Sequence, residues 1–195
     1  MTFIVIDGID GCGKSSHARD LVKYLRAQGR EAIFLKEPTA ESPAGKELAM
    51  ALKEDRRPSP EEELRLFTED RRWDVENRIM PAMNEGKDIV MDRYYYSTIA
   101  YQGARGMDIA KIMEMNGFAP RPDLAIILDI DPETAGERIG RRGKEDYFEK
   151  RDYLEKVREI FLSMRDYPEV VIIDSSGPYM ETKKRVEEAV KPLIL

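Results

Sequence analysis

Several residue types that mark whole classes of protein are scarce in this sequence. Its 195 residues contain one cysteine, so no disulfide can form within the chain, and a reducing compartment is favoured. No run approaches the roughly 18 apolar residues that a membrane span needs, and residues 1–6 lack the basic start of a secretory signal. We therefore expect a cytoplasmic protein with no membrane partner.

Positive charge is also in deficit. The sequence has 32 Lys and Arg residues against 38 Asp and Glu residues, a net charge of -6. Non-specific binding of long nucleic acid needs a basic face that displaces counterions, so we expect no nucleic-acid partner. The sequence also lacks repeats, low-complexity tracts and linkers. Its length suits one domain, which we place at residues 1–195.

What the sequence does contain is a phosphate-binding loop. The apolar run at 3–6 is followed by Gly8 and then by Gly13-Lys14-Ser15, at the spacing G-x-x-x-x-G-K-S. Glycines let successive N–H groups point at an anion, and the helix expected at 16–25 adds its positive end. Lys14 is expected to reach the β- and γ-phosphates, and Ser15 to offer a hydroxyl to Mg²⁺. The residues predicted to bind the triphosphate are Gly8, Ile9, Asp10, Gly11, Cys12, Gly13, Lys14, Ser15 and Ser16.

Apolar, β-branched runs alternate with helical stretches along the rest of the chain. The expected strands are 3–6, 32–35, 89–91, 124–128 and 170–173. Strands separated by helices pair in parallel and bury both faces of their sheet beneath helices. With the phosphate-binding loop, this order predicts an α/β P-loop NTPase fold, a five-stranded parallel sheet flanked by helices on both faces. Ligands then bind at the carboxyl ends of the strands.

The third expected strand ends in Asp92-Arg93. An acid at the end of a buried strand is placed to hold a Mg²⁺-bound water near the phosphate-binding loop, and the Arg93 fork suits a phosphate. The alternative is that these two side chains only pair with each other. On the following helix, side chains four residues apart offer hydroxyl, amide and aromatic groups to one ligand: Ser97, Thr98, Tyr101 and Gln102.

A long helix is expected at 61–83. Leu64, Phe67 and Arg71 share one of its faces, so an aromatic ring and a guanidinium could address one planar ligand. The plainer alternative, which this helix taken alone favours, makes Phe67 a core residue. In that alternative Arg71 is a surface partner of an acid on the same helix, namely Asp70, Asp74 or Glu76.

A basic segment follows the fourth expected strand. Arg138, Arg141 and Arg142 lie at helical spacing, and two glycines, at 140 and 143, interrupt the helix. Such a segment, at about 138–147, could close as an Arg-rich lid over a triphosphate, exclude water and supply a cation to the transferred group. The alternative is an ordinary basic surface helix.

We make two minor predictions, one for a residue within the phosphate-binding loop and one for a residue just after it. His17 is expected to make a local contact and no catalytic one. Cys12 is expected to fill a small slot, although the helix N-terminus and Lys14 could lower the pKa of its thiol. That lowering would make the activity sensitive to oxidation.

Taken in order, these motifs resemble the thymidylate kinase family, and the likeness spans nearly the whole chain. The matching segments are Gly8–Ser16, Glu37-Pro38-Thr39, Leu66-Phe67 with Arg71, Asp92-Arg93-Tyr94 with Ser97 and Tyr101-Gln102, Pro122-Asp123-Leu124 with Leu128-Asp129, and the Arg-rich segment. The resemblance implies transfer of the γ-phosphoryl group of ATP to dTMP, with Mg²⁺ as cofactor, by a homodimer.

The resemblance also implies roles for particular residues. Phe67 would stack on thymine, Arg71 would bond the exocyclic oxygen of the base, and Arg93 would hold the acceptor phosphate. Further residues implied around dTMP are Asp10, Glu37, Ser97, Thr98, Tyr101 and Gln102, with Arg138 implied at ATP and with Ser15 and Asp92 at the metal.

The same resemblance implies which cations act on the transferred phosphoryl group. Some relatives carry a basic residue inside the phosphate-binding loop, where this chain has Gly11 and Cys12. The catalytic cations implied here are therefore Lys14, Arg93 and a lid arginine, Arg141 or Arg142.

Other functions agree with parts of the sequence. A deoxynucleoside kinase would accept a 5′-hydroxyl and need a carboxylate base, which Glu37 could supply. Another nucleoside monophosphate kinase of this fold stays open, because Ala49 stands where many relatives carry an arginine near the acceptor. A GTP-dependent switch is disfavoured by the lack of an Asn-Lys-x-Asp motif. An inactive binding module is disfavoured by the presence of Lys14, Ser15 and Asp92-Arg93.

Overall fold

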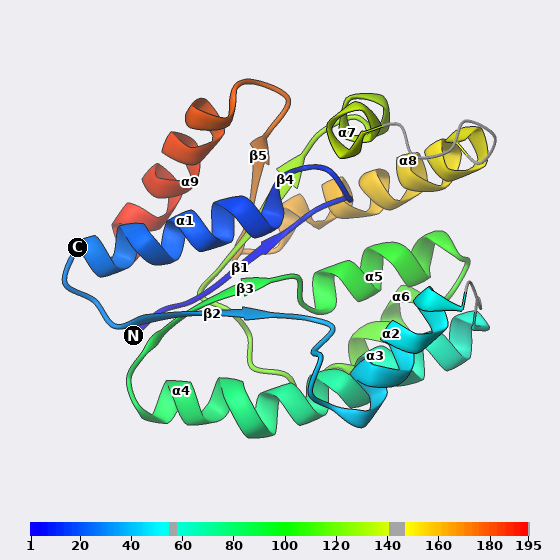
Figure 1. Cartoon of the computed structure of the whole chain (residues 1–195), viewed down its shortest axis with the longest axis horizontal. Helices are drawn as coiled ribbons and strands as arrows, with labels where there is room; N and C mark the ends of the chain where they lie inside the picture. The colour runs from blue at the N-terminus through cyan, green and yellow to red at the C-terminus, as the bar shows by residue number, and fades with distance from the viewer. Residues whose placement is uncertain (55–57, 141–146, 195) are drawn as a thin grey trace.

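A five-stranded sheet forms the centre of the molecule (Figure 1). The computed structural model describes residues 1–54, 58–140 and 147–194. The strands are β1 (Phe3–Asp7), β2 (Ala32–Lys36), β3 (Asp88–Asp92), β4 (Leu124–Asp129) and β5 (Val170–Asp174), all parallel and in the order β2-β3-β1-β4-β5. The predicted α/β fold is confirmed, and every predicted strand boundary lies within one residue of the observed one.

Burial follows the position of each strand in the sheet. β1 and β3 are buried along their whole length, while the edge strands β2 and β5 carry partly exposed side chains. Ile6 of β1 lies opposite Asp92 of β3. The phosphate-binding loop that follows β1 and the Asp92-Arg93 motif at the end of β3 are therefore neighbours.

Helices cover both faces of the sheet. They are α1 (Lys14–Ala27), α2 (Pro43–Lys53), α3 (Pro60–Asp74), α4 (Met80–Asn84), α5 (Tyr95–Ala104), α6 (Ile109–Met115), α7 (Pro132–Ile139), α8 (Tyr147–Ser163) and α9 (Tyr179–Ile194). α1 packs with α9 on one face, and α4, α5 and α8 belong to the other (Figure 1). Within the described ranges, no helix has the length and apolar character needed to cross a membrane.

The long helix predicted at 61–83 is wrong in one respect, because it is not regular. A π-helical segment, Val75–Ile79, separates α3 from α4. Pro81 lacks an N–H, and its ring crowds the carbonyl of the residue four positions earlier, so the turn before it widens. The two short helices α2 and α6 were not among the predicted elements.

The strands all point toward one end of the molecule. In Figure 1 β1, β2 and β3 run to the right, where the loop before α1 lies near α7, while β5 ends toward the top, and both chain termini lie to the left. This right-hand end is where a doubly wound sheet binds its ligands.

Candidate functional site

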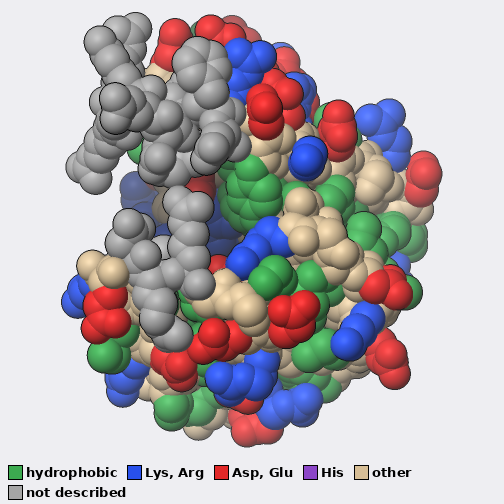
Figure 2. Space-filling model, turned by 90° about the vertical axis from the view of Figure 1, so that its right-hand side faces the viewer, with side chains coloured by type: hydrophobic (Ala, Val, Ile, Leu, Met, Phe, Trp, Pro, Cys, Tyr) green, Lys and Arg blue, Asp and Glu red, His purple; other side chains and the backbone are tan. Residues whose placement is uncertain are grey.

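A pocket of about 270 Å³ opens at the carboxyl ends of β1, β2 and β3. Figure 2 faces this end of the molecule and shows Lys and Arg side chains deep in a hollow. The pocket is lined by Asp10, Gly11, Gly13, Lys14, Ser15, Ser16, Lys36, Asp92, Arg93, Arg138 and Ile139. A concave site with this many cations suits an anionic ligand of several charges.

The loop before α1 has the geometry of an anion site. Gly13 precedes the helix in the left-handed conformation, with φ 93°, and no side chain caps the helix. The first N–H groups of α1 are thus left for a ligand. Lys14 is buried, and its Nζ donates to the carbonyl of Ile9 at 2.8 Å, which arches the loop over the lysine.

Gly11 leaves no room for a side chain. Its φ is 91°, and a Cβ built there would lie 2.4 Å from the carbonyl oxygen of Ala135 in α7. A basic residue at this position would have to displace the α7 backbone. Close packing on α7 thus leaves no room for an arginine at position 11 of the loop.

Asp10 is where two cations of the pocket meet. The Arg93 Nη2 donates to Asp10 Oδ1, and Lys14 Nζ lies 3.7 Å from the same oxygen. Desolvation raises the pKa of Asp10, but the charges of Arg93 and Lys14 bring it below its ordinary value. Arg93 does not pair with Asp92, so the alternative that these neighbours only bind each other is wrong.

The Arg93 side chain is held from two sides. Its backbone φ is 71°, and Arg93 is the only described residue other than glycine with a positive φ. Such a conformation is strained for a long side chain and re-aims it toward the pocket. Its Nη1 donates to Ser97 Oγ at 2.8 Å, and its guanidinium lies 5.3 Å from the Tyr101 ring centroid.

Asp7, which was not among the residues predicted for the site, anchors this arrangement. Its carboxylate is fully buried and accepts from the N–H groups of Gly8 and Tyr94 and from both the N–H and the hydroxyl of Ser97. Burial raises its pKa, while the charge of Arg93 opposes the rise. Asp7 therefore ties the start of the phosphate-binding loop to the start of α5.

Ser15 and Asp92, the predicted metal residues, are in contact. Ser15 Oγ donates to Asp92 Oδ2, and Lys36 Nζ lies 3.4 Å from the same oxygen. The buried Asp92 Oδ1 has no hydrogen-bond partner in the described part of the chain. Lys36 was missed by the sequence analysis, although it ends β2 immediately before Glu37 and so had to lie at the ligand-binding edge.

Arg71 is not a surface ion-pair residue, so that alternative is wrong. The side chain is 2% exposed and forms an ion pair with Glu37 Oε2 through Nη2 at 2.6 Å and Nε at 2.9 Å. Its Nη2 also donates to Thr98 Oγ1 at 3.1 Å. Burial raises the pKa of Glu37, and the Arg71 guanidinium opposes that rise.

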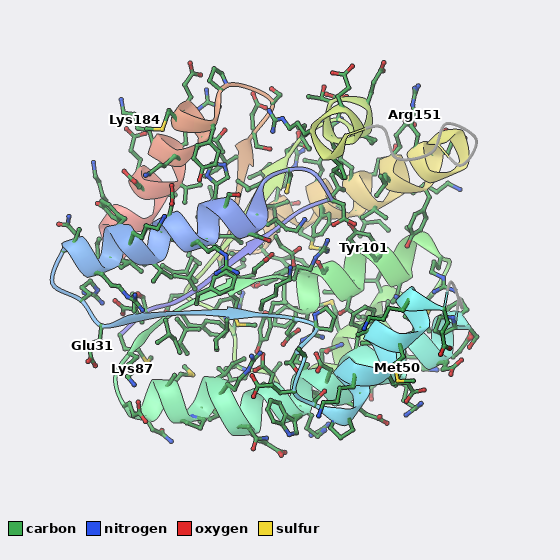
Figure 3. All side chains as sticks on the ribbon, viewed as in Figure 1. Glu31, Met50, Lys87, Tyr101, Arg151 and Lys184 are labelled. Carbon is green, nitrogen blue, oxygen red and sulfur yellow. The ribbon has the colours of Figure 1, made fainter. Side chains whose placement is uncertain are left out.

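The other residues predicted around an acceptor lie in different surroundings. Phe67 is not part of the main core; it lies half-buried against a small cluster of Ala44, Leu48 and Leu66. Tyr101 packs from α5 onto α8, where its ring contacts Phe161 (Figure 3). The remaining one, Gln102, is buried and donates to Glu63 Oε2 at 2.6 Å, so its amide nitrogen already has a protein partner.

Arg138 is the only one of the three predicted lid arginines that lies within the described residues. It lines the pocket, and its Nη2 donates to the carbonyls of Ser176 and Gly177 at 2.8 and 3.2 Å. This ties α7 to the loop that follows β5. Arg141 and Arg142 lie outside the described residues.

The hypothesis of an activated Cys12 thiol is wrong. Cys12 is 0% exposed, and burial raises its pKa, although Lys14 Nζ is 3.8 Å from the sulfur. The thiol is buried in the interior of the loop. Its role is to fill space beneath Gly8, as the small-slot prediction had it.

His17 has an unusual environment that allows a first test. Its ring is 3% exposed and stacks on Tyr179 of α9, with 4.3 Å between ring centroids, and Nδ1 has no partner among the described residues. Burial lowers its pKa to about 4, with the charges of Arg138 and Lys183 adding to the effect and Asp20 opposing it.

We expect the imidazole of His17 to stay neutral in the folded protein down to about pH 5. Because the folded state disfavours the proton, stability is lost as pH falls from the unfolded value, about 6.5, toward the folded one, by up to about 3 kcal/mol. As the chain has one histidine, a single pair of imidazole NMR signals reports the titration. A folded-state midpoint near 6.5 would contradict the buried stack.

Comparisons with known proteins agree with this geometry. The sequence model of the thymidylate kinase family matches residues 6–186. A probable thymidylate kinase of Archaeoglobus fulgidus is 45% identical over 98% of this chain and 95% of its own length. A thymidylate kinase of Desulfotalea psychrophila is 40% identical, with 98% and 95% covered, and a probable one of Pyrococcus horikoshii is 38% identical, with 99% and 97% covered. With a phosphate-binding loop and an Asp-Arg motif around one pocket, and with similarity along almost its full length, the chain belongs to the thymidylate kinase family.

Proposed function

We propose that this kinase transfers the γ-phosphoryl group of ATP to dTMP, giving ADP and dTDP. The observation that carries the proposal is the meeting of Lys14 and Arg93 at Asp10. Lys14 belongs to the phosphate-binding loop, where ATP would bind. Arg93 belongs to the β3–α5 junction, on the side of the proposed acceptor site that contains Arg71 and Phe67. Transfer between two phosphates needs the cations of both sites around one point, and an ionised acceptor needs no general base.

The Asp92–Ser15 pair supports Mg²⁺ as the cofactor. Mg²⁺ is usually held by one or two carboxylates, with phosphate oxygens and waters completing its shell, so a cage of protein ligands is not required. The unpartnered Asp92 Oδ1 and the Ser15 hydroxyl are oxygen groups of this kind. When bound, the ion would neutralise charge on the phosphates of ATP.

A deoxynucleoside kinase has less support from the site. Phosphorylation of a 5′-hydroxyl needs a carboxylate free to take a proton. Glu37, the candidate base, has an Oε1 without a hydrogen-bond partner among the described residues, but it is 2% exposed, and its Oε2 is held by two N–H groups of Arg71. Assay of thymidine beside dTMP separates the two functions, and phosphorylation of thymidine alone would overturn the proposal.

Phe67→Ala should raise the KM for dTMP far more than the KM for ATP. Stacking on an aromatic face contributes roughly 1–3 kcal/mol per base, so a rise of about ten-fold is expected. Phe34→Ala is the matched control, since Phe34 is also half-buried but lies under Arg19 on the edge strand β2. Steady-state kinetics with each substrate varied measures both, and equal changes in the two KM values would argue against base stacking.

The catalytic arginine of the transferred group is proposed to come from the lid, at about 138–147. Support comes from Gly11, whose approach to Ala135 leaves no space for a basic side chain in the loop. Arg138 stands at the pocket, where it would contact ATP. Arg141→Ala and Arg142→Ala should lower kcat with little change in KM, and unchanged kcat in both would refute the assignment.

We further propose that residues 1–195 form one kinase domain, that it acts as a homodimer, and that it works in the cytoplasm. The first is supported by the single sheet and its covering helices. The homodimer is taken from the family, and sedimentation analysis tests it; a purely monomeric species would count against it.

The cytoplasmic location is supported by the single, buried thiol, and fractionation of the source cells tests it.

A further inference from the structure

The Arg71 guanidinium has nearly all of its donors occupied by protein. Arginine carries five N–H groups. Nε donates to Glu37, Nη2 to Glu37 and Thr98, and Nη1 to Asn116 Oδ1 at 2.5 Å. One N–H of Nη1 has no acceptor in the described part of the chain. Buried donors without a partner are rare in folded proteins, so this one points to a ligand.

We propose that Asn116 is a positioning residue for base recognition, which holds Arg71 so that only this one N–H is offered to the base. The inference rests on the proposed function, in which the base of the acceptor nucleotide meets Arg71. Asn116 was not among the predicted site residues. It follows α6 directly and is 45 residues from Arg71 in sequence.

The orientation of the Asn116 amide is fixed by its own helix. Its Nδ2 donates to the carbonyl of Ile112 at 2.8 Å, so Oδ1 faces Arg71. A flipped amide would lose both hydrogen bonds and would set an N–H group against the guanidinium. The side chain is 4% exposed, so a flipped amide would leave buried polar groups unpaired.

A second contact holds the same two segments together. Arg72, next in α3, lies with its guanidinium 3.9 Å from the ring centroid of Phe118. Consecutive arginines of α3 thus bind both ends of the short stretch 116–118. This gives a structural reason for Arg72 and limits the movement of Arg71 relative to Asn116.

A single remaining N–H has a chemical consequence for specificity. It matches a base that presents an acceptor, as the 4-oxo group of thymine or uracil does. A 4-amino group, as in cytosine, would set donor against donor and leave a buried group unpaired. Every N–H of a guanidinium is a donor, so another of them would not suit a 4-amino group either. If Arg71 were free to swing away from the base, however, the clash would be relieved, and this discrimination would weaken.

The test compares dTMP, dUMP and dCMP as acceptors for Asn116→Ala, Asn116→Asp and the unchanged enzyme. In Asn116→Ala we expect the KM for dTMP to rise roughly ten-fold, the preference for dTMP over dCMP to fall by a similar factor, and the KM for ATP to stay unchanged. Asn116→Asp gives up the bond from Nδ2 to Ile112 but keeps an acceptor for Arg71, so it should retain most of the preference. Equal losses in the two variants would overturn the proposal.

Asn77→Ala is the matched control. Asn77 donates from Nδ2 to the carbonyl of Trp73 at 2.8 Å, the same bond to a residue four positions earlier, but without an arginine partner. It should leave all three acceptors unaffected. An Asn116→Ala enzyme that is less stable but keeps its base preference would show a merely structural role and would also overturn the proposal. If the unchanged enzyme does not phosphorylate dTMP, the proposed function itself fails instead.

Discussion

Lys14→Met is expected to reduce kcat by a factor of at least about a hundred, because one preorganised cation is lost from the transferred phosphoryl group. The methionine keeps the length of the side chain in a position that is 6% exposed, so the fold should persist. Turnover by a coupled ATP assay and circular dichroism of the same sample together measure the effect.

The control for this variant lies on the same helix. Lys23 is 76% exposed and pairs with Asp20 at 2.8 Å. Lys23→Met removes the same charge from α1 and should leave kcat within about two-fold, since exposed ion pairs contribute little. Comparable losses in the two variants would mean that net charge, and not contact with the phosphates, is what Lys14 supplies.

Arg71→Met is expected to lower the free energy of unfolding by about 3–5 kcal/mol and to abolish tight dTMP binding. Removing one partner of a buried ion pair leaves the other without compensation, and Glu37 is 2% exposed. Urea denaturation measures the first effect, and titration with dTMP measures the second.

Two further variants test whether the loss of stability in Arg71→Met comes from the buried ion pair. Arg72→Met removes the neighbouring guanidinium, which stacks on Phe118, and should cost about 1 kcal/mol or less. The double variant Arg71→Met, Glu37→Leu should recover most of the stability, because apolar groups can replace a buried pair, but not the binding of dTMP. If Arg71→Met costs no more than Arg72→Met, the ion pair is not what holds this region.

The parts of the structure that local patterns specify were predictable. Alternation of apolar strands with helices located β1 to β5, and the spacing from Gly8 to Ser15 predicted the turn from β1 into α1. The contact of Ser15 with Asp92 also follows from topology, because β1 and β3 are neighbours and their ends share one edge.

What could not be predicted depends on contacts between distant segments. Arg71 meets Glu37 and Asn116, which are 34 and 45 residues away, and only the folded chain brings α3, the end of β2 and the end of α6 together. Helical spacing alone favoured acids on the same helix as partners of Arg71. The high thiol pKa of Cys12 was hidden for a similar reason, since sequence shows the nearby charge of Lys14 but not the burial that outweighs it.

The central claim is that the acceptor is the phosphate of dTMP. The most direct measurement is the kcat/KM of the full-length enzyme with ATP and Mg²⁺ for dTMP, dUMP, dCMP, dAMP, dGMP and thymidine. We expect dTDP as the principal product, with dCMP slower by a factor on the order of a hundred or more and no turnover of thymidine. A higher kcat/KM for another monophosphate, or phosphorylation of thymidine without that of dTMP, would contradict it.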